Sequence, residues 1–247
     1  MEAKLTNLLQ ISDEYQRILR LKLYPVGVKF CKKSNELKIG KVPNEKLSFC
    51  QMVRIVSQSK WVLACPSDQM GCSIAQVNFG FRKPDESDIQ LYLQRLTDKR
   101  EIAQSIINVK PKLKPGEIKG LLFGPLDKFE PDIVFFIIDS AQALVLMRAY
   151  GVAFGNDLTF RTGASSNVCA YGGIISYNTM SPNLTIPCAG AKRHGLYQDY
   201  ELIFVTPLQI AITLANTLLA VEKKNLLNFP IVQGYLSSTK PVDYLMK

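Results

Sequence analysis

Two stretches of this chain resemble each other, and each of them carries two cysteines. They cover residues 49–71 and 168–195, and each opens on an apolar residue, a cysteine and a short amphipathic segment. In each stretch the second cysteine follows an apolar run and precedes a loop of small residues. The four cysteines are Cys50, Cys65, Cys169 and Cys188. An internal duplication that packs its copies about a pseudo-twofold axis would bring these thiols together, so the pattern predicts where a functional site lies.

Helical and strand patterns alternate along the chain. Apolar residues recur at helical spacing over residues 4–22, 88–109 and 208–223, whereas the continuous apolar run 133–138 is typical of a strand buried on both faces. This alternation predicts an α/β or α+β protein with two similar layered halves and a sheet in each half. Prolines and a glycine between positions 111 and 116 indicate the seam. The predicted halves are residues 1–118 and 119–247, packed as one compact unit.

The positive charge of the chain is concentrated in its first half. Residues 1–120 carry 21 lysines and arginines against 12 acidic residues, whereas residues 121–247 carry 9 of each kind. A basic half can attract an acidic protein partner or an anionic small molecule. Nucleic acid is a poor fit, because the basic residues are dispersed and no nucleic-acid-binding motif occurs. An apolar stripe on the predicted helix 208–223 leaves self-association open.

The sequence predicts a cytoplasmic protein. Its most apolar stretch, residues 133–147, contains Asp139 and is shorter than the roughly 20 residues that a membrane span needs. The first residues lack the apolar core of a signal peptide. In a reducing compartment, cysteines are more often free, metal-bound or redox-active than paired in disulfides.

The repeated cysteines are the candidate metal ligands. Cys50 and Cys169 each fall in the first turn of a predicted helix, where the positive end of the helix dipole favours the thiolate. Cys65 and Cys188 each precede a loop of small residues, whose N–H groups can turn toward a sulfur. Cys72 can replace Cys65 as the second ligand of the first half. Four thiolates suit an iron–sulfur cluster such as 4Fe–4S, with structural zinc as the alternative.

The loop after Cys188 adds three side chains that can bind an anion. They are Lys192, Arg193 and His194, the last being the single histidine of the chain. They predict an alternative function, in which a metal-free protein binds an anionic small molecule in a pocket between the halves. No spacing identifies a catalytic nucleophile with its base, so the sequence leaves open whether the protein is an enzyme.

Several separated motifs resemble a prokaryotic family known as domain of unknown function 169. They occur in order at residues 23–30, 49–53, 70–75, 131–134, 167–169 and 186–193. The family is found mostly in archaea and anaerobic bacteria, so the resemblance implies oxygen-sensitive chemistry, although it supplies no established activity. The recognisable cysteines of the family match Cys50, Cys72, Cys169 and Cys188. The resemblance therefore favours Cys72 in the first half, where the internal similarity favours Cys65.

The leading prediction is a cytoplasmic redox or accessory protein that binds an iron–sulfur cluster with thiolates from both halves. The sequence gives no substrate, no reaction and no cluster type.

Overall fold

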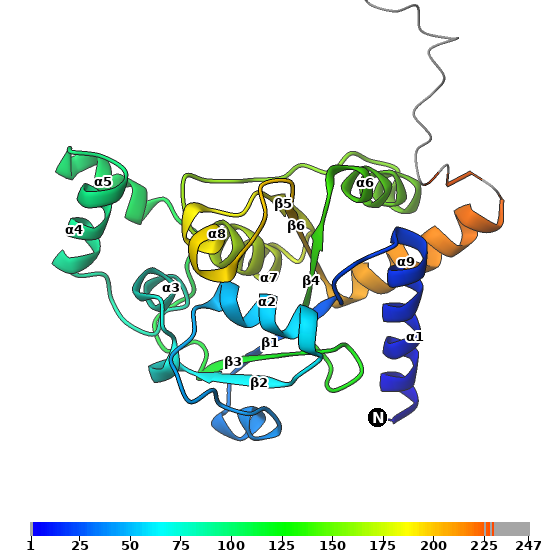
Figure 1. Cartoon of the computed structure of the whole chain (residues 1–247), viewed down its shortest axis with the longest axis horizontal. Coiled ribbons are helices and arrows are strands. Elements are labelled where there is room, and N and C mark those ends of the chain that lie inside the picture. Colours follow the sequence, from blue (N-terminus) through cyan, green and yellow to red (C-terminus); the bar gives the residue numbers. More distant parts are fainter. Residues whose placement is uncertain (1, 225, 228, 230–247) are drawn as a thin grey trace, which may run out of the picture.

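Six strands form one antiparallel sheet through the middle of the computed structural model, which describes residues 2–224, 226, 227 and 229 (Figure 1). The strands lie in the order β2-β3-β1-β4-β6-β5, and each neighbouring pair is antiparallel. Their bounds are β1 Val26–Cys31, β2 Leu63–Pro66, β3 Gly120–Gly124, β4 Ile133–Ile138, β5 Asn183–Thr185 and β6 Leu202–Pro207. The alternation of helices and strands thus confirms the predicted α/β class.

The two halves of the chain share this one sheet, which corrects the expectation of a sheet in each half. β1 pairs with β4 at the centre, so that three strands lie on either side of that pairing. The connectivity repeats, with β1, β3 and β2 on one side and β4, β6 and β5 on the other. A duplication predicts such a repeat, although common descent of the halves stays a prediction. β3 lies after residue 118, the predicted end of the first half, yet it pairs with β1 and β2. The boundary between the two repeated units therefore lies between β3 and β4.

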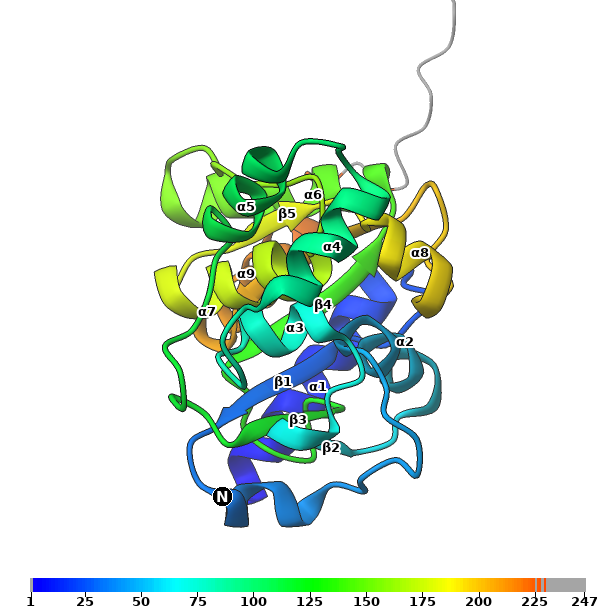
Figure 2. The same ribbon diagram turned by 90° about the vertical axis from the view of Figure 1, so that its left-hand side faces the viewer.

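Helices cover both faces of the sheet (Figures 1 and 2). One face packs against α1 Glu2–Leu19, α6 Ser140–Phe154 and α9 Leu208–Lys223. The other face packs against α2 Phe49–Ser59, α3 Ser73–Asn78, the π-helix η3 Asn167–Ile174, α7 Ile175–Thr179 and α8 Ala189–Gly195. All six residues of β4 are buried, because Phe135 points into the second layer and Phe136 into the first. This is the burial that the continuous apolar run predicted.

A helical hairpin lies beyond α3 at one end of the molecule (Figure 1). It consists of α4 Glu86–Arg95 and α5 Arg100–Asn108, where the sequence pattern predicted one helix over residues 88–109. The break lets the apolar stripes of the two helices pack on each other, which buries Tyr92 against Ile107 in a small separate core. Two short 3-10 helices, η1 Ser34–Ile39 and η2 Ser67–Gln69, complete the elements. Among the described helices, none combines the length and apolarity that crossing a membrane requires.

Candidate thiol site

Four of the six cysteines come together in the layer that contains α2, α3, η3 and α8. Cys50 lies in the first turn of α2, Cys169 lies in η3, and Cys72 and Cys188 are the N-cap residues of α3 and α8. In every pair that these four cysteines form, the negative charge of one thiolate would raise the pKa of the other thiol. All six cysteines of the chain are free thiols. We call Cys50, Cys72, Cys169 and Cys188 the thiol site.

The other two cysteines lie outside the thiol site. Cys65 is buried in β2 with its Sγ 3.6 Å from the carbonyl oxygen of Pro66, and Cys31 is buried in β1. Among the described residues, no other cysteine influences the pKa of either thiol. Cys72 is also the positional counterpart of Cys188, since each caps the short helix that follows an edge strand of the sheet.

The start of α2 is fixed by the predicted capping residue. Ser48 accepts a hydrogen bond from the Gln51 N–H at 3.3 Å, and the Gln51 side-chain oxygen accepts one from the Ser48 N–H at 2.9 Å. This reciprocal cap confirms the helix start. The Ser48 hydroxyl also lies 3.2 Å from the Cys50 sulfur, so the cap of the helix is at the same time a polar neighbour of the thiol.

Cys169 lies in a wider turn than the predicted α-helix. Ser166 adopts the left-handed conformation at φ 63°. Its carbonyl oxygen accepts hydrogen bonds from the N–H groups of both Ala170 and Tyr171. Gly172 allows close packing in this segment, because a Cβ there would lie 3.1 Å from the Val205 side chain, whereas Gly173 has room for one. π-Helical turns are rare and frequently occur at functional sites.

Burial keeps the thiols of Cys50, Cys72 and Cys169 protonated at neutral pH. It raises the pKa of Cys50 to about 11, against the opposing effect of the Ser48 hydroxyl. The pKa of Cys72 is raised by burial against hydrogen bonding from the N–H groups of Ala75 and Ile74, and that of Cys169 is raised well above its ordinary value. The mutual repulsion of thiolates adds to each rise. A metal that binds here must displace protons.

Two buried polar side chains border the site, and the sequence pattern predicted neither of them. The Asn78 amide in α3 donates to the Cys169 sulfur at 3.8 Å and is 1% exposed. Lys110 follows α5, is 6% exposed, and its Nζ has no hydrogen-bond partner in the described part of the chain. Its pKa is lowered to about 8 by burial, with thiolates at Cys169, Cys188 and Cys72 acting in the opposite direction. In sequence, a lysine in a loop before Pro111 looks solvent-exposed.

A buried ion pair joins α2 to the segment after α8. The Arg54 guanidinium donates to both carboxylate oxygens of Glu201 and to the carbonyl oxygens of Gly195 and Leu196. It also stacks over the Tyr197 ring, 4.3 Å from the ring centroid. The Tyr197 hydroxyl donates to the Cys50 carbonyl oxygen at 3.1 Å. These contacts hold Cys188, at the start of α8, beside Cys50.

The predicted anion-binding residues lie on the outer side of α8. Arg193 and His194 are exposed, and the Lys192 ammonium forms an ion pair with Asp199 at 2.5 Å. The cations that interact electrostatically with thiols of the site are instead Lys110, with three of the four, and Arg95, with Cys72. Lys192, Arg193 and His194 therefore line the surface of the helix that Cys188 begins, on a different side from the thiol site.

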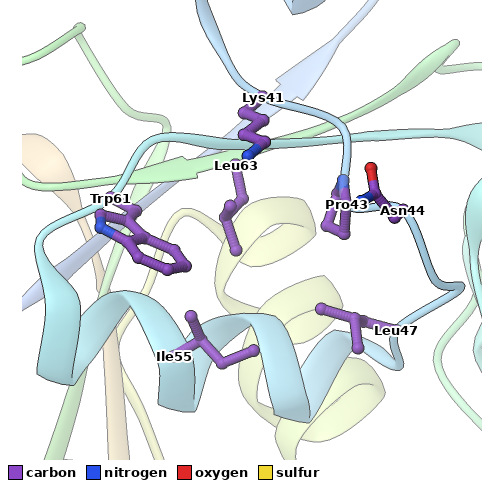
Figure 3. A pocket seen from close by; sticks show the side chains of 7 residues that line it. All are labelled: Lys41, Pro43, Asn44, Leu47, Ile55, Trp61 and Leu63. Carbon is purple, nitrogen blue, oxygen red and sulfur yellow. The ribbon is translucent and has the colours of Figure 1, made fainter.

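Two surface pockets lie away from these cysteines. One, of about 190 Å³, is seen in Figure 3 and is lined by Lys41, Pro43, Asn44, Leu47, Ile55, Trp61 and Leu63. The other, of about 700 Å³, lies between α6 and α9 on the opposite face of the sheet. Neither has a cysteine in its lining. Within the described residues, no three His, Cys, Asp or Glu side chains converge closely enough to hold a single metal ion.

The buried thiols predict that the metal-free protein loses stability at alkaline pH. Burial raises the pKa of Cys31 and of Cys65 from 9.0 to about 12. Between about pH 9 and 11 the unfolded chain releases thiol protons that the folded protein retains, so the free energy of unfolding falls as pH rises. Lys110 and Lys112, whose pKa values are lowered by burial, act in the opposite direction but are outnumbered by the thiols with raised pKa values. We expect a lower urea midpoint at about pH 10.5 than at about pH 8, and equal midpoints would contradict the burial of these thiols.

Comparisons with known proteins agree with the motifs. A family model described as uncharacterised ArCR, DUF169, matches residues 15–216. An uncharacterised protein of Methanocaldococcus jannaschii is 24% identical over 208 residues, which are 80% of this chain and 89% of that relative. No solved structure matches the chain significantly. The family match spans all six strands and the thiol site, and the chain belongs to the DUF169 family.

Proposed function

We propose that the chain binds an iron–sulfur cluster through Cys50, Cys72, Cys169 and Cys188 and acts as an electron carrier or redox accessory protein. The main support is the meeting of four thiols from four separate elements, two in each half of the chain, of which Cys169 is buried and the other three are partly buried. Four thiolates are the usual ligand set of such a cluster, which supplies one-electron transfer when bound.

Zinc is the alternative to a cluster, because it too takes four thiolate ligands. Zinc–sulfur bonds of about 2.3 Å bring four ligand sulfurs within about 3.8 Å of one another. The thiols influence one another's pKa, yet no three acidic, histidine or cysteine side chains of the described chain meet around one ion-sized point. A polynuclear cluster separates its irons, so its ligands enclose a larger space.

The electrostatics favour a bound group over a reactive thiol. Nucleophilic cysteines have lowered pKa values, whereas those of Cys50, Cys72 and Cys169 are raised by burial. The buried ammonium of Lys110 has no anionic partner in the described residues. A cluster held by four thiolates keeps a net negative charge and would provide one. The residues present therefore fit a thiolate-bound cluster.

The proposal includes a compartment and a kind of partner. Thiol ligands stay reduced in the cytoplasm, which agrees with the predicted location. The basic residues of the first half would attract an acidic protein that exchanges electrons with the cluster.

The test is the iron and sulfide content of the full chain, purified and reconstituted without oxygen. We expect stoichiometric iron and sulfide with visible charge-transfer absorption in the wild-type protein. The variants C50A, C72A, C169A and C188A are each expected to lose most of the bound iron, because a missing thiolate leaves one iron without its protein ligand.

The matched controls are C31A and C65A, since both residues are buried cysteines outside the thiol site. Both variants are expected to retain the wild-type iron content and spectrum. If C65A loses its iron and C72A retains it, Cys65 and not Cys72 is the second cluster ligand of the first half. A colourless wild-type protein without iron after anaerobic reconstitution would overturn the proposal.

A further inference from the structure

The amine of Lys110 is buried without a hydrogen-bond partner among the described residues. Its residue is 6% exposed, and its Nζ makes no hydrogen bond within the described part of the chain. The Nζ lies 3.9 Å from the centroid of the Tyr92 ring, which gives the ammonium one favourable contact. A cation–π contact replaces only part of the hydration that a buried ammonium loses. The surroundings of Lys110 are therefore electrostatically incomplete.

Charges of both signs reach Lys110: the ammonium of Lys112 disfavours its positive charge, and the thiol site, once deprotonated, favours it. Thiolates at Cys169, Cys188 and Cys72 would stabilise its ammonium, and Cys169 has the largest effect of the three. Tyr92, whose ring contacts the amine, is itself held in place. Its hydroxyl is hydrogen-bonded at 3.0 Å to the hydroxyl of Ser165, which lies just before η3. The lysine is thus held between the helical hairpin and the segment that carries Cys169.

We propose that the ammonium of Lys110 is the fixed counter-charge of the thiol site and raises the reduction potential of the cluster bound there. The inference rests on the proposed function. Reduction adds an electron to a group that is already negative, and a nearby cation in a medium of low dielectric constant stabilises the reduced form more than the oxidised form. Lys110 is a positioning and tuning residue, since the sulfurs themselves make the bonds to iron.

The test is the midpoint potential of the loaded full-length protein, measured by anaerobic spectroelectrochemical titration. K110M removes the charge and keeps an apolar chain of similar length, so we expect a more negative midpoint than in the wild type. K110R keeps the charge and is expected to retain most of the wild-type potential. The control is K114M, because Lys114 is exposed and lies in the same loop; its potential is expected to match the wild type.

The outcomes separate this inference from the proposed function. A wild-type protein that binds no cluster overturns the proposed function before Lys110 is examined. Equal potentials in loaded wild type and K110M overturn the role of Lys110 alone. If K110M folds by circular dichroism but binds no cluster while K110R does, the counter-charge is supported. If K110R also folds and fails to bind, the positive charge is not what the site requires, and the inference is wrong.

Discussion

Replacing Arg54 with methionine is expected to lower the free energy of unfolding by about 3–5 kcal/mol, because it leaves the carboxylate of Glu201 buried without its cation. Both residues are 7% exposed. The substitution also removes the hydrogen bonds to the carbonyl oxygens of Gly195 and Leu196. Urea unfolding of the metal-free protein, followed by circular dichroism, measures the change.

Two control variants identify the cause of that loss. The double variant R54M/E201M is expected to recover most of the stability, since an apolar pair often replaces a buried ion pair at little cost. R100M breaks the exposed pair with Glu86 and is expected to cost far less than R54M, because solvent screens that pair. A loss in R54M as small as that in R100M would contradict the burial of the Arg54–Glu201 pair.

The same variant connects stability to the thiol site. Arg54 ties α2 to the end of α8, and these two helices carry Cys50 and Cys188. Because R54M loosens this connection, folded R54M is expected to bind less iron under the anaerobic reconstitution described above. R54M/E201M is expected to recover the bound iron only in part, because the hydrogen bonds to the carbonyl oxygens stay lost.

Local signals in the sequence were sufficient to predict individual elements. Ser48 begins α2 as a capping residue, and the helix predicted over residues 208–223 is present with those bounds after Pro207. Both depend on residues within one or two turns of each other, where capping and the fixed φ of proline act directly. The buried strand β4 was equally predictable, because its apolar run is continuous.

Long-range pairing was not predictable in the same way. Joining β1 to β4 into one sheet depends on contacts over a hundred residues apart, which no local pattern encodes. The internal similarity matched Cys65 to Cys188 because each follows an apolar run and precedes a loop of small residues. The structure instead gives Cys72 the equivalent position, because both Cys72 and Cys188 cap a helix after an edge strand. The family resemblance favoured Cys72 since it compares whole motifs. Lys110 left no signal, because burial of a loop lysine is a property of the assembled fold.

Replacing Phe49 with alanine is expected to lower the free energy of unfolding by about 3–5 kcal/mol through the cavity it leaves. Phe49 is the first residue of α2 and is 1% exposed. Its ring centroid lies 5.1 Å from that of Phe79, 5.2 Å from that of Phe123 and 5.5 Å from that of Phe135. The three neighbours come from α3's end, β3 and β4, so the ring joins the thiol-bearing layer to the sheet.

The matched control is F160A, because Phe160 is 48% exposed and its truncation leaves little cavity; we expect a loss below about 1 kcal/mol. F49L keeps most of the apolar contact and is expected to cost less than F49A. Since Cys50 follows Phe49 directly, folded F49A should also bind less iron than F160A. Equal iron content in the two folded variants would mean that the Phe49 ring does not help to position Cys50. Equal unfolding energies for F49A and F160A would contradict the central position of this ring in the core.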